Sequence, residues 1–187
     1  TGNWSSSGSR AIVIDTTAPT APSVSGTTPT NDTTPTWSWS PGGGGNGTYR
    51  YKLDNSDLTS GATQTTSTSY TPGSGISVGS HTLYVQERDA TGNWSSSGSR
   101  AIVIDTTAPS VDNFTLSDTA LKAGETATVT LVFSEAVASF SSAADITVAN
   151  GTLAAMSSAD NITWAGTFTP TANTEDASNT LSLATSY

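Results

Sequence analysis

Residues 1–19 read TGNWSSSGSRAIVIDTTAP, and residues 91–109 repeat this stretch letter for letter. The two copies are offset by 90 residues (91 minus 1), which is close to the ~100 residues of a small β-sandwich. A fixed period of this kind indicates a chain built from repeated structural units. Each copy ends in DTTAP, where the proline lacks an amide donor and favours an extended residue before it. We interpret both DTTAP segments as short, stiff linkers.

These linkers divide the chain into three pieces. Residues 1–15 are predicted to be the C-terminal strand of a preceding repeat, and residues 16–105 a complete repeat. Residues 106–187 do not repeat the sequence pattern of residues 16–105 and are predicted to be a second type of unit. By analogy with the complete repeat, a turn and a final strand should follow Tyr187, so we expect residues 106–187 to lack their last strand.

Alternation of apolar and polar residues predicts β-strands in both units. PTWSWS places Trp37 and Trp39 on one face, and HTLYVQE does the same with Leu83 and Val85. TATVTLVF, at residues 126–133, alternates in the same way, and Gly-rich turns separate the strands. No stretch shows a convincing helical period. The expected fold is therefore all-β, with tandem Ig-like or fibronectin-III-like Greek-key β-sandwiches.

The composition excludes several classes of partner. The formal net charge is −9 with a pI near 4.1, which argues against nucleic acid and anionic membranes. No apolar run approaches the ~18 residues of a membrane span, so membrane insertion is not expected. The chain has no cysteine, and disulfides, thiolate metal sites and cysteine nucleophiles are excluded.

The strand frame resembles a known family. W-x-W, Y-x-Y-x-L-D, H-T-L-Y-V, D-A-T-G-N-W-S and I-x-I-D-T-T-A-P, in this order, resemble bacterial immunoglobulin-like repeats, and the D-x-x-G-N-x-S turn is similar to one in fibronectin type III modules. LVFSEAV, ADITVANGTL and TFTP in residues 106–187 resemble a second class of bacterial Ig-like repeat. Such repeats occur in giant secreted adhesins and biofilm proteins of Gram-negative bacteria.

The resemblance implies a function for the chain. It would be an extracellular structural spacer at the bacterial cell surface, a rod within a large adhesin used for cell adhesion. Its partners would be the neighbouring Ig-like repeats of the same chain. The family also implies stiffening of the junctions by Ca²⁺, as a structural ion.

The residues themselves suggest where such an ion could bind. Ca²⁺ takes about six to eight oxygen ligands, and no contiguous EF-hand loop is present, so separate loops must supply them. Ig topology gathers the entering linker, the PGGGGNG loop and the last hairpin at one pole of a sandwich. This should bring together Asp15, Glu87, Asp89 and the side chain of Asn93. The alternative is that aspartates such as Asp89 only cap their own turns.

A second group of acids is expected at the opposite pole. Asp105 lies in the leaving linker and should meet Glu135, in the SEAV segment of the next unit. Asp32, in the TNDTT loop, could join them. Asp15 and Asp105 are the best candidates among the predicted metal ligands because each DTTAP linker begins with one of them.

Other functions have weaker sequence signals, and we predict no enzyme. The GGGGNG loop precedes a strand rather than the helix that a dinucleotide site requires. His81 has no nucleophile motif to serve, and a Glu87–Asp89 acid pair would need a cleft. The alternative to a spacer is a glycan- or protein-binding module that uses pole loops, for which Trp4 and Trp94 are the candidate aromatic contacts.

The N-terminal segment raises one more hypothesis. A single AIVI strand has little stability alone. The N-terminal strand of one copy could complete residues 106–187 of the next, in a head-to-tail donation that would build filaments. The alternative is that this segment is the end of a preceding repeat.

Overall fold

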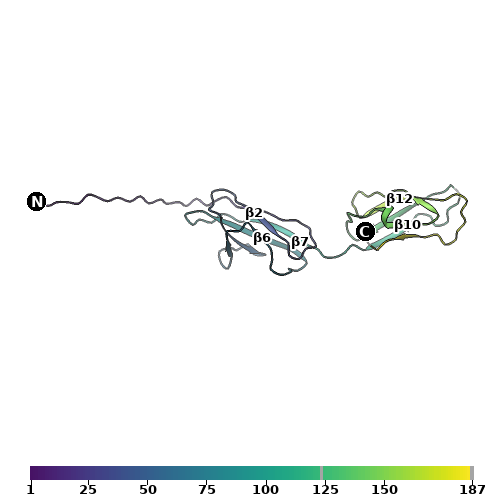
Figure 1. The fold of residues 1–187 in the computed structure, drawn as a ribbon, viewed down its shortest axis with the longest axis horizontal. Helices are drawn as coiled ribbons and strands as arrows, with labels where there is room; N and C mark the ends of the chain where they lie inside the picture. The colour runs from purple at the N-terminus through teal and green to yellow at the C-terminus, as the bar shows by residue number, and fades with distance from the viewer. Residues whose placement is uncertain (123, 186–187) are drawn as a thin grey trace. The chain divides into compact units, whose positions relative to one another are not determined.

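The computed structural model describes residues 1–122 and 124–185. The chain divides into two compact units, Thr1–Thr107 and Ala108–Tyr187 (Figure 1). The division falls inside the second DTTAP linker, two residues after the position that the sequence suggested. Within the described residues, no helix has the length and apolar character needed to cross a membrane.

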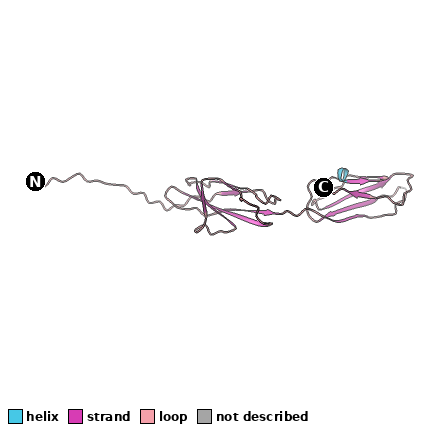
Figure 2. Ribbon diagram, turned by 60° about the horizontal axis from the view of Figure 1, so that its bottom comes forward, coloured by secondary structure: helices cyan, strands magenta, loops and turns pink. Residues whose placement is uncertain are grey.

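Unit 1 is an antiparallel β-sandwich. One of its sheets has the strand order β1-β2-β5 and the other has the order β4-β3-β6-β7. Figure 2 shows the strands in magenta. The strands are β1 (Ser23–Ser25), β2 (Trp37–Ser40), β3 (Thr48–Leu53), β4 (Thr63–Thr65), β5 (Ser69–Tyr70), β6 (Gly79–Arg88) and β7 (Gly98–Ile104). The predicted fold class is confirmed for this unit.

The core of unit 1 follows the predicted alternation. Trp37 and Trp39 are buried while the serines between and after them are exposed. Leu83 and Val85 are fully buried on β6. The indole nitrogen of Trp37 donates to the carbonyl of Arg100 at 3.0 Å, so the largest fully buried side chain also has its polar atom satisfied.

Strand β7 lies against both sheets. It pairs with β6 from Gly98 opposite Val85 to Ile104 opposite Gly79, and Ile104 also forms a bridge to Thr30. Ile102 and Ile104 are fully buried. A side chain at Gly98 would collide with the carbonyl of Pro22, so β7 requires glycine at this close approach.

Unit 2 is a second antiparallel β-sandwich with a separate core. Its sheets have the strand orders β11-β12-β9-β8 and β10-β13. Val129, Leu131 and Phe133 are buried on β9, as predicted. The elements are β8 (Val111–Leu116), β9 (Ala127–Phe133), the short helix α1 (Ser142–Asp145), β10 (Ile146–Val148), β11 (Gly151–Leu153), β12 (Thr163–Pro170) and β13 (Leu181–Leu183).

The N-terminal segment behaves differently from its identical copy. Residues 1–15 have no assigned strand and run as an extended segment (Figure 1). Trp4 is 97% exposed, and Ile12 and Ile14 are each 85% exposed. Residues 11–14 pair with no strand in the described part of the chain. Within the described residues, the same letters are therefore a core strand at one place and an exposed segment at the other.

Candidate functional site

Asp89 organises the turn that follows β6. Its Oδ1 accepts the backbone amides of Thr91 at 2.9 Å, Gly92 at 2.6 Å and Asn93 at 2.8 Å. The Thr91 hydroxyl donates to the same oxygen at 2.9 Å. Desolvation opposes ionisation, but the hydrogen bonds from Asn93, Thr91 and Gly92 outweigh it and lower the pKa of Asp89 to about 2. The Asp89 carboxylate is therefore charged, and its Oδ1 is occupied by hydrogen bonds from the residues of the turn.

Asp15 lies beside this turn, as the sequence suggested. The side-chain amide of Asn93 donates to the Asp15 carbonyl at 3.0 Å and to Asp89 Oδ2 at 2.8 Å. The Thr91 hydroxyl reaches Asp15 Oδ2 at 3.4 Å. Asn93 thus joins the entering linker to the Asp89 turn, with two carboxylates close together.

Glu87 occupies a different environment. It is 1% exposed, and its Oε1 accepts the Gly47 amide at 3.3 Å. Its carboxyl also packs on Gly45, where an added Cβ would collide with it. Burial, and then the charge and contact of Glu87, raise the pKa of Tyr49. Glu87 Oε2 is buried and accepts no well-formed hydrogen bond from the described residues. The carboxylate faces the glycine loop, whereas Asp15 and Asp89 are joined through Asn93.

At the other pole of unit 1, Thr30 connects two predicted ligands. Its carbonyl accepts the Asp105 amide at 2.9 Å, and its hydroxyl accepts the Asp32 amide at 3.1 Å. Hydrogen bonds from Thr107 lower the pKa of Asp105. Glu135 belongs to unit 2, where its Oε1 is buried without a hydrogen-bond partner among the described residues.

Most of these aspartates share the local role that the sequence analysis gave as the alternative to metal binding. Each accepts the amide of the residue two positions further on, which is an Asx-turn. The sequence signal is Asp-x-Thr or Asp-x-Ser, and it could have identified the whole set. The pairs are Asp15 with Thr17, Asp32 with Thr34, Asp57 with Thr59, Asp89 with Thr91, Asp105 with Thr107 and Asp176 with Ser178. Among the described residues, no group of three His, Cys, Asp or Glu side chains is placed to hold a metal.

His81 is part of an arrangement that has the chemical order of a catalytic triad. Its Nδ1 lies 2.6 Å from Asp54 Oδ2, and its Nε2 lies 3.2 Å from the Ser77 hydroxyl. The same Nε2 is only 2.9 Å from the Ser77 carbonyl, which requires a proton on this nitrogen. The bond to Asp54 accordingly raises the pKa of His81. Because Nδ1 lies against Asp54 and Nε2 against the Ser77 carbonyl, both ring nitrogens are occupied by these contacts, and we describe the group as a clasp between a loop and a turn.

Trp94, a candidate ligand contact, is covered by the protein itself. The Arg50 guanidinium lies 4.3 Å from the centre of the Trp94 ring, and that of Arg88 lies 5.8 Å away. Such cation–π contacts hold the indole against the base of the hairpin. Trp94 is therefore partly buried and in contact with two arginines, in contrast to the exposed Trp4.

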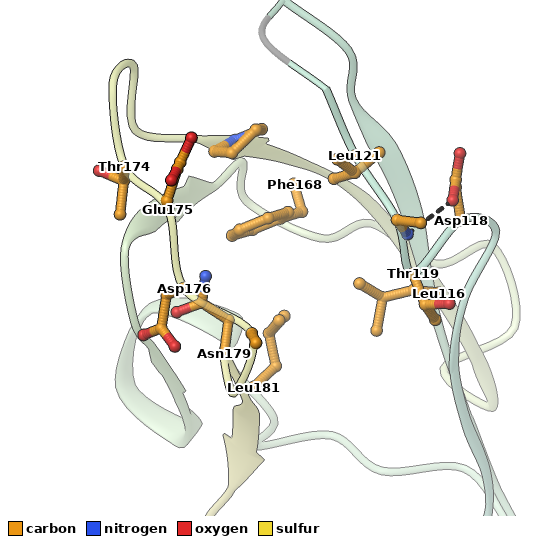
Figure 3. Close-up of a pocket in the computed structure, with 13 residues that line it drawn as sticks. Leu116, Asp118, Thr119, Leu121, Phe168, Thr174, Glu175, Asp176, Asn179 and Leu181 are labelled. Atoms are coloured by element: carbon orange, nitrogen blue, oxygen red, sulfur yellow. Dashed lines mark hydrogen bonds between the residues drawn. The ribbon is translucent and has the colours of Figure 1, made fainter.

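Unit 2 contains a hollow of about 510 Å³ at one end of its sandwich. Figure 3 shows Phe168 and Leu181 at its apolar floor and Asp118, Glu175 and Asp176 around it. Asp118 and Asp176 each accept the amide two residues further on. Asp118 and Asp176 thus repeat the turn role seen in unit 1.

The family comparison concerns this second unit. A family model described as a bacterial Ig-like domain matches residues 105–187. Residues 105–187 are thus similar to a bacterial Ig-like domain. The resemblance expected for residues 106–187 is thereby confirmed, and the match also takes in the linker aspartate Asp105. Bacterial Ig-like domains are modules that are often extracellular or displayed on the cell surface. No curated protein matches the chain.

Proposed function

We propose that the chain is an extracellular structural spacer of a large repetitive bacterial adhesin. The observation that carries this proposal is the 19-residue stretch that recurs at a fixed offset, combined with a separate core in each unit. Each module buries its own apolar side chains, so length is gained by adding modules. The spacer would carry a distal binding domain away from the cell surface.

The entering linker is held to its module in a way that suits this role. Pro19 is buried, and the next amide, Thr20, donates to the Gly43 carbonyl at 3.0 Å. Asp15 is tied to Asn93. A linker fixed at both its acidic and its proline end transmits force to the module and bends less than a free chain.

We include Ca²⁺ at this pole in the proposal. At this pole, the oxygen atoms that could bind a metal are Asp15 Oδ2, Asp89 Oδ2 through its second lone pair, and the amide oxygen of Asn93. These are hard oxygen ligands of the kind that Ca²⁺ prefers. Two carboxylates without a third acid would need further oxygens from the backbone and water, so the site would be weaker than one made of several acids.

The test measures the melting temperature of unit 1 with millimolar Ca²⁺ and with excess chelator. The proposal expects Ca²⁺ to raise the melting temperature of the parent chain and not that of Asp15→Ala. Asp57→Ala is the matched control, because Asp57 caps the same kind of turn away from the linker and should keep the Ca²⁺ response. If Ca²⁺ changes nothing in the parent chain, the ion is rejected and the acids act only as turn caps.

The spacer role has its own test, which does not depend on the ion. Scattering from the parent chain and from a longer chain with one more 90-residue repeat should show the maximum dimension growing with the added repeat. An unchanged maximum dimension would contradict the spacer, whatever the result with Ca²⁺.

A further inference from the structure

The outer face of the four-stranded sheet of unit 1 carries two arginines beside one indole ring. We propose that this group, Arg50, Arg88 and Trp94, is a binding site for the carboxylate of an acidic sugar. It is called here the arginine site. The proposal adds a glycan contact on a sheet face of the module, and it does not depend on the spacer role or on Ca²⁺.

Strand pairing brings the arginine site together. The residues that alternate with Gln86 and Arg88 on β6 are buried, so these two side chains lie on the outer face, where they are half-buried. Arg50 on β3 is the ladder partner of Gln86, and Trp94 is the bridge partner of Arg88. Side chains of directly paired residues lie on the same face of a sheet, so all four belong to one surface.

The indole ring of Trp94 holds both guanidinium groups. The Arg50 guanidinium lies 4.3 Å from the ring centre and that of Arg88 lies 5.8 Å from it. Arg50 Nε also donates to Gln86 Oε1 at 2.7 Å, which fixes the orientation of this guanidinium. An arginine stacked on an aromatic ring keeps its planar fork of N–H groups for a carboxylate. The two charges are therefore positioned before any ligand arrives.

Neither arginine has an acidic partner within the protein. Among the described residues, no salt bridge involves Arg50 or Arg88, and Arg88 Nε is buried without a hydrogen-bond partner there. Burial lowers the pKa of Arg50, and the charge of Asp57 opposes this effect only in part. Asp57 Oδ1 is itself occupied by the amide and the hydroxyl of Thr59. An external anion would reduce the repulsion between the two guanidinium groups and supply the acceptor that Arg88 lacks.

The charge distribution indicates what kind of anion fits. Three of the six Lys and Arg residues, Arg50, Lys52 and Arg88, lie on the outer face, although the chain has a net charge of −9. A dense polyanion would be repelled by the rest of the chain. A single carboxylate on an otherwise neutral glycan can reach the arginine site without that penalty.

The surroundings favour a sugar over an acidic protein. Gln64 is the partner of Arg50, and Tyr84 is the partner of Lys52, so an amide and a phenol extend the outer face beside the arginines. Amide and phenol groups form hydrogen bonds with sugar hydroxyls.

The competing partner is unit 2 of a second copy, which is rich in acids. Several of its carboxylates already accept amides of their own turns, as Asp118, Asp160 and Asp176 do. These oxygens are less available for an arginine on another molecule, so the outer face is better suited to a carboxylated glycan.

A titration of the full chain followed by NMR tests the site. The probes are sialyllactose and digalacturonic acid, which carry carboxylates, and lactose, which is the neutral match of sialyllactose. Both acidic sugars should shift the indole N–H signal of Trp94, and lactose should not. Trp4 is an internal control, because it has the same flanking residues and is 97% exposed. General stacking of sugars on tryptophan would shift the signal of Trp4 at least as much as that of Trp94.

Substitutions then identify the groups that bind. Arg50→Gln and Arg88→Gln should each weaken sialyllactose binding by about tenfold or more, because each removes a charge-assisted hydrogen bond. Arg88→Lys keeps the charge without the planar fork and should weaken it less. Arg100→Gln is the matched control, since Arg100 pairs with the buried Leu83 and lies on the opposite face of the sheet. It should leave binding unchanged.

A fold check and a measurement on the parent chain keep the test decisive. The indole signal of Trp37, which donates to the Arg100 carbonyl, shows whether a variant is folded. If both Arg→Gln variants fail to fold, the parent chain still has to bind sialyllactose more weakly as the salt concentration rises. Affinity that is independent of salt would overturn the proposal.

Three other results would also overturn it. The first is no shift of the Trp94 signal with either acidic sugar, or an equal shift with lactose. The second is unchanged sialyllactose affinity in folded Arg50→Gln and Arg88→Gln. The third is self-association of the parent chain in sedimentation that Arg88→Gln abolishes, because this would assign the arginine site to an acidic surface of a second copy.

Discussion

The two copies of AIVI allow one substitution to be made twice in the same local sequence. Ile102→Ala and Ile12→Ala change the same letter between the same neighbours, but Ile102 is fully buried and Ile12 is 85% exposed. Local propensity is identical in the two variants, so any difference in stability comes from tertiary packing.

The expected magnitude follows from the contacts of Ile102. Removing three buried carbons costs ~2.4 kcal/mol at ~0.8 kcal/mol per carbon, and the cavity adds to this. The cavity would lie over Gly26, which has no side chain to fill it. We expect Ile102→Ala to destabilise unit 1 by about 3 kcal/mol and Ile12→Ala to change it by less than about 0.5 kcal/mol.

Urea unfolding followed by tryptophan fluorescence measures this difference. The Trp164→Phe background removes the indole of unit 2, so the buried Trp37 and Trp39 report on unit 1. With a slope of about 1 kcal/mol per molar urea, the midpoint should fall by about 3 M for Ile102→Ala only. A cost above about 1 kcal/mol for Ile12→Ala, or a cost below it for Ile102→Ala, would refute the packing argument.

Three further predictions concern the turns. The folded pKa of Asp89, about 2, is below its ordinary value of 3.8, so the ionised Asp89 should stabilise unit 1 fully above pH 3.8 and lose this effect as the pH falls toward 2. In an acid unfolding curve, Asp89→Ala should lack the loss of stability between these pH values. An acid unfolding curve that is the same in Asp89→Ala and in the parent chain would contradict the prediction. The pKa of His81 is raised above 6.5, so the clasp should stabilise unit 1 fully below that value and lose its effect as pH rises through the raised pKa. The melting temperature of the parent chain should therefore fall as the pH rises above 6.5, and that of His81→Gln should fall less. Gly45→Ala should lower the melting temperature of unit 1, because its Cβ would collide with the buried Glu87 carboxyl, whereas Gly73→Ala meets no atom within 4 Å and should have little effect.

The fold of both units could be predicted because burial follows a period of two. Buried residues alternate with more exposed ones in both units, as at Trp37, Trp39 and Leu83 in unit 1 and at Val129 and Leu131 in unit 2. The sequence therefore indicates which face of each strand points inward. The short helix α1 was not predictable, since four residues are too few to show a helical period. Pairing across the sheets depends on contacts distant in sequence, which alternation does not specify.

The candidate site was predictable only in part. Ig topology correctly suggested that Asp15 would lie near Asp89, because the entering linker and the last hairpin share a pole. It also placed the side chain of Asn93 in this group, and Asn93 does donate to both Asp15 and Asp89. It did not reveal that Glu87 turns toward the glycine loop. That outcome depends on side-chain rotamers and on the close approach at Gly45, and neither leaves a periodic pattern in the sequence.

Single-molecule pulling of the chain tests the central claim most directly. A spacer made of modules with separate cores should unfold in two separate steps. Unit 1, between Ser23 and Ile104, should lengthen by about 260 Å, and unit 2, between Val111 and Leu183, by about 230 Å, at ~3.6 Å per residue less the folded length. One cooperative step of the combined length, or gradual extension without steps, would contradict the account.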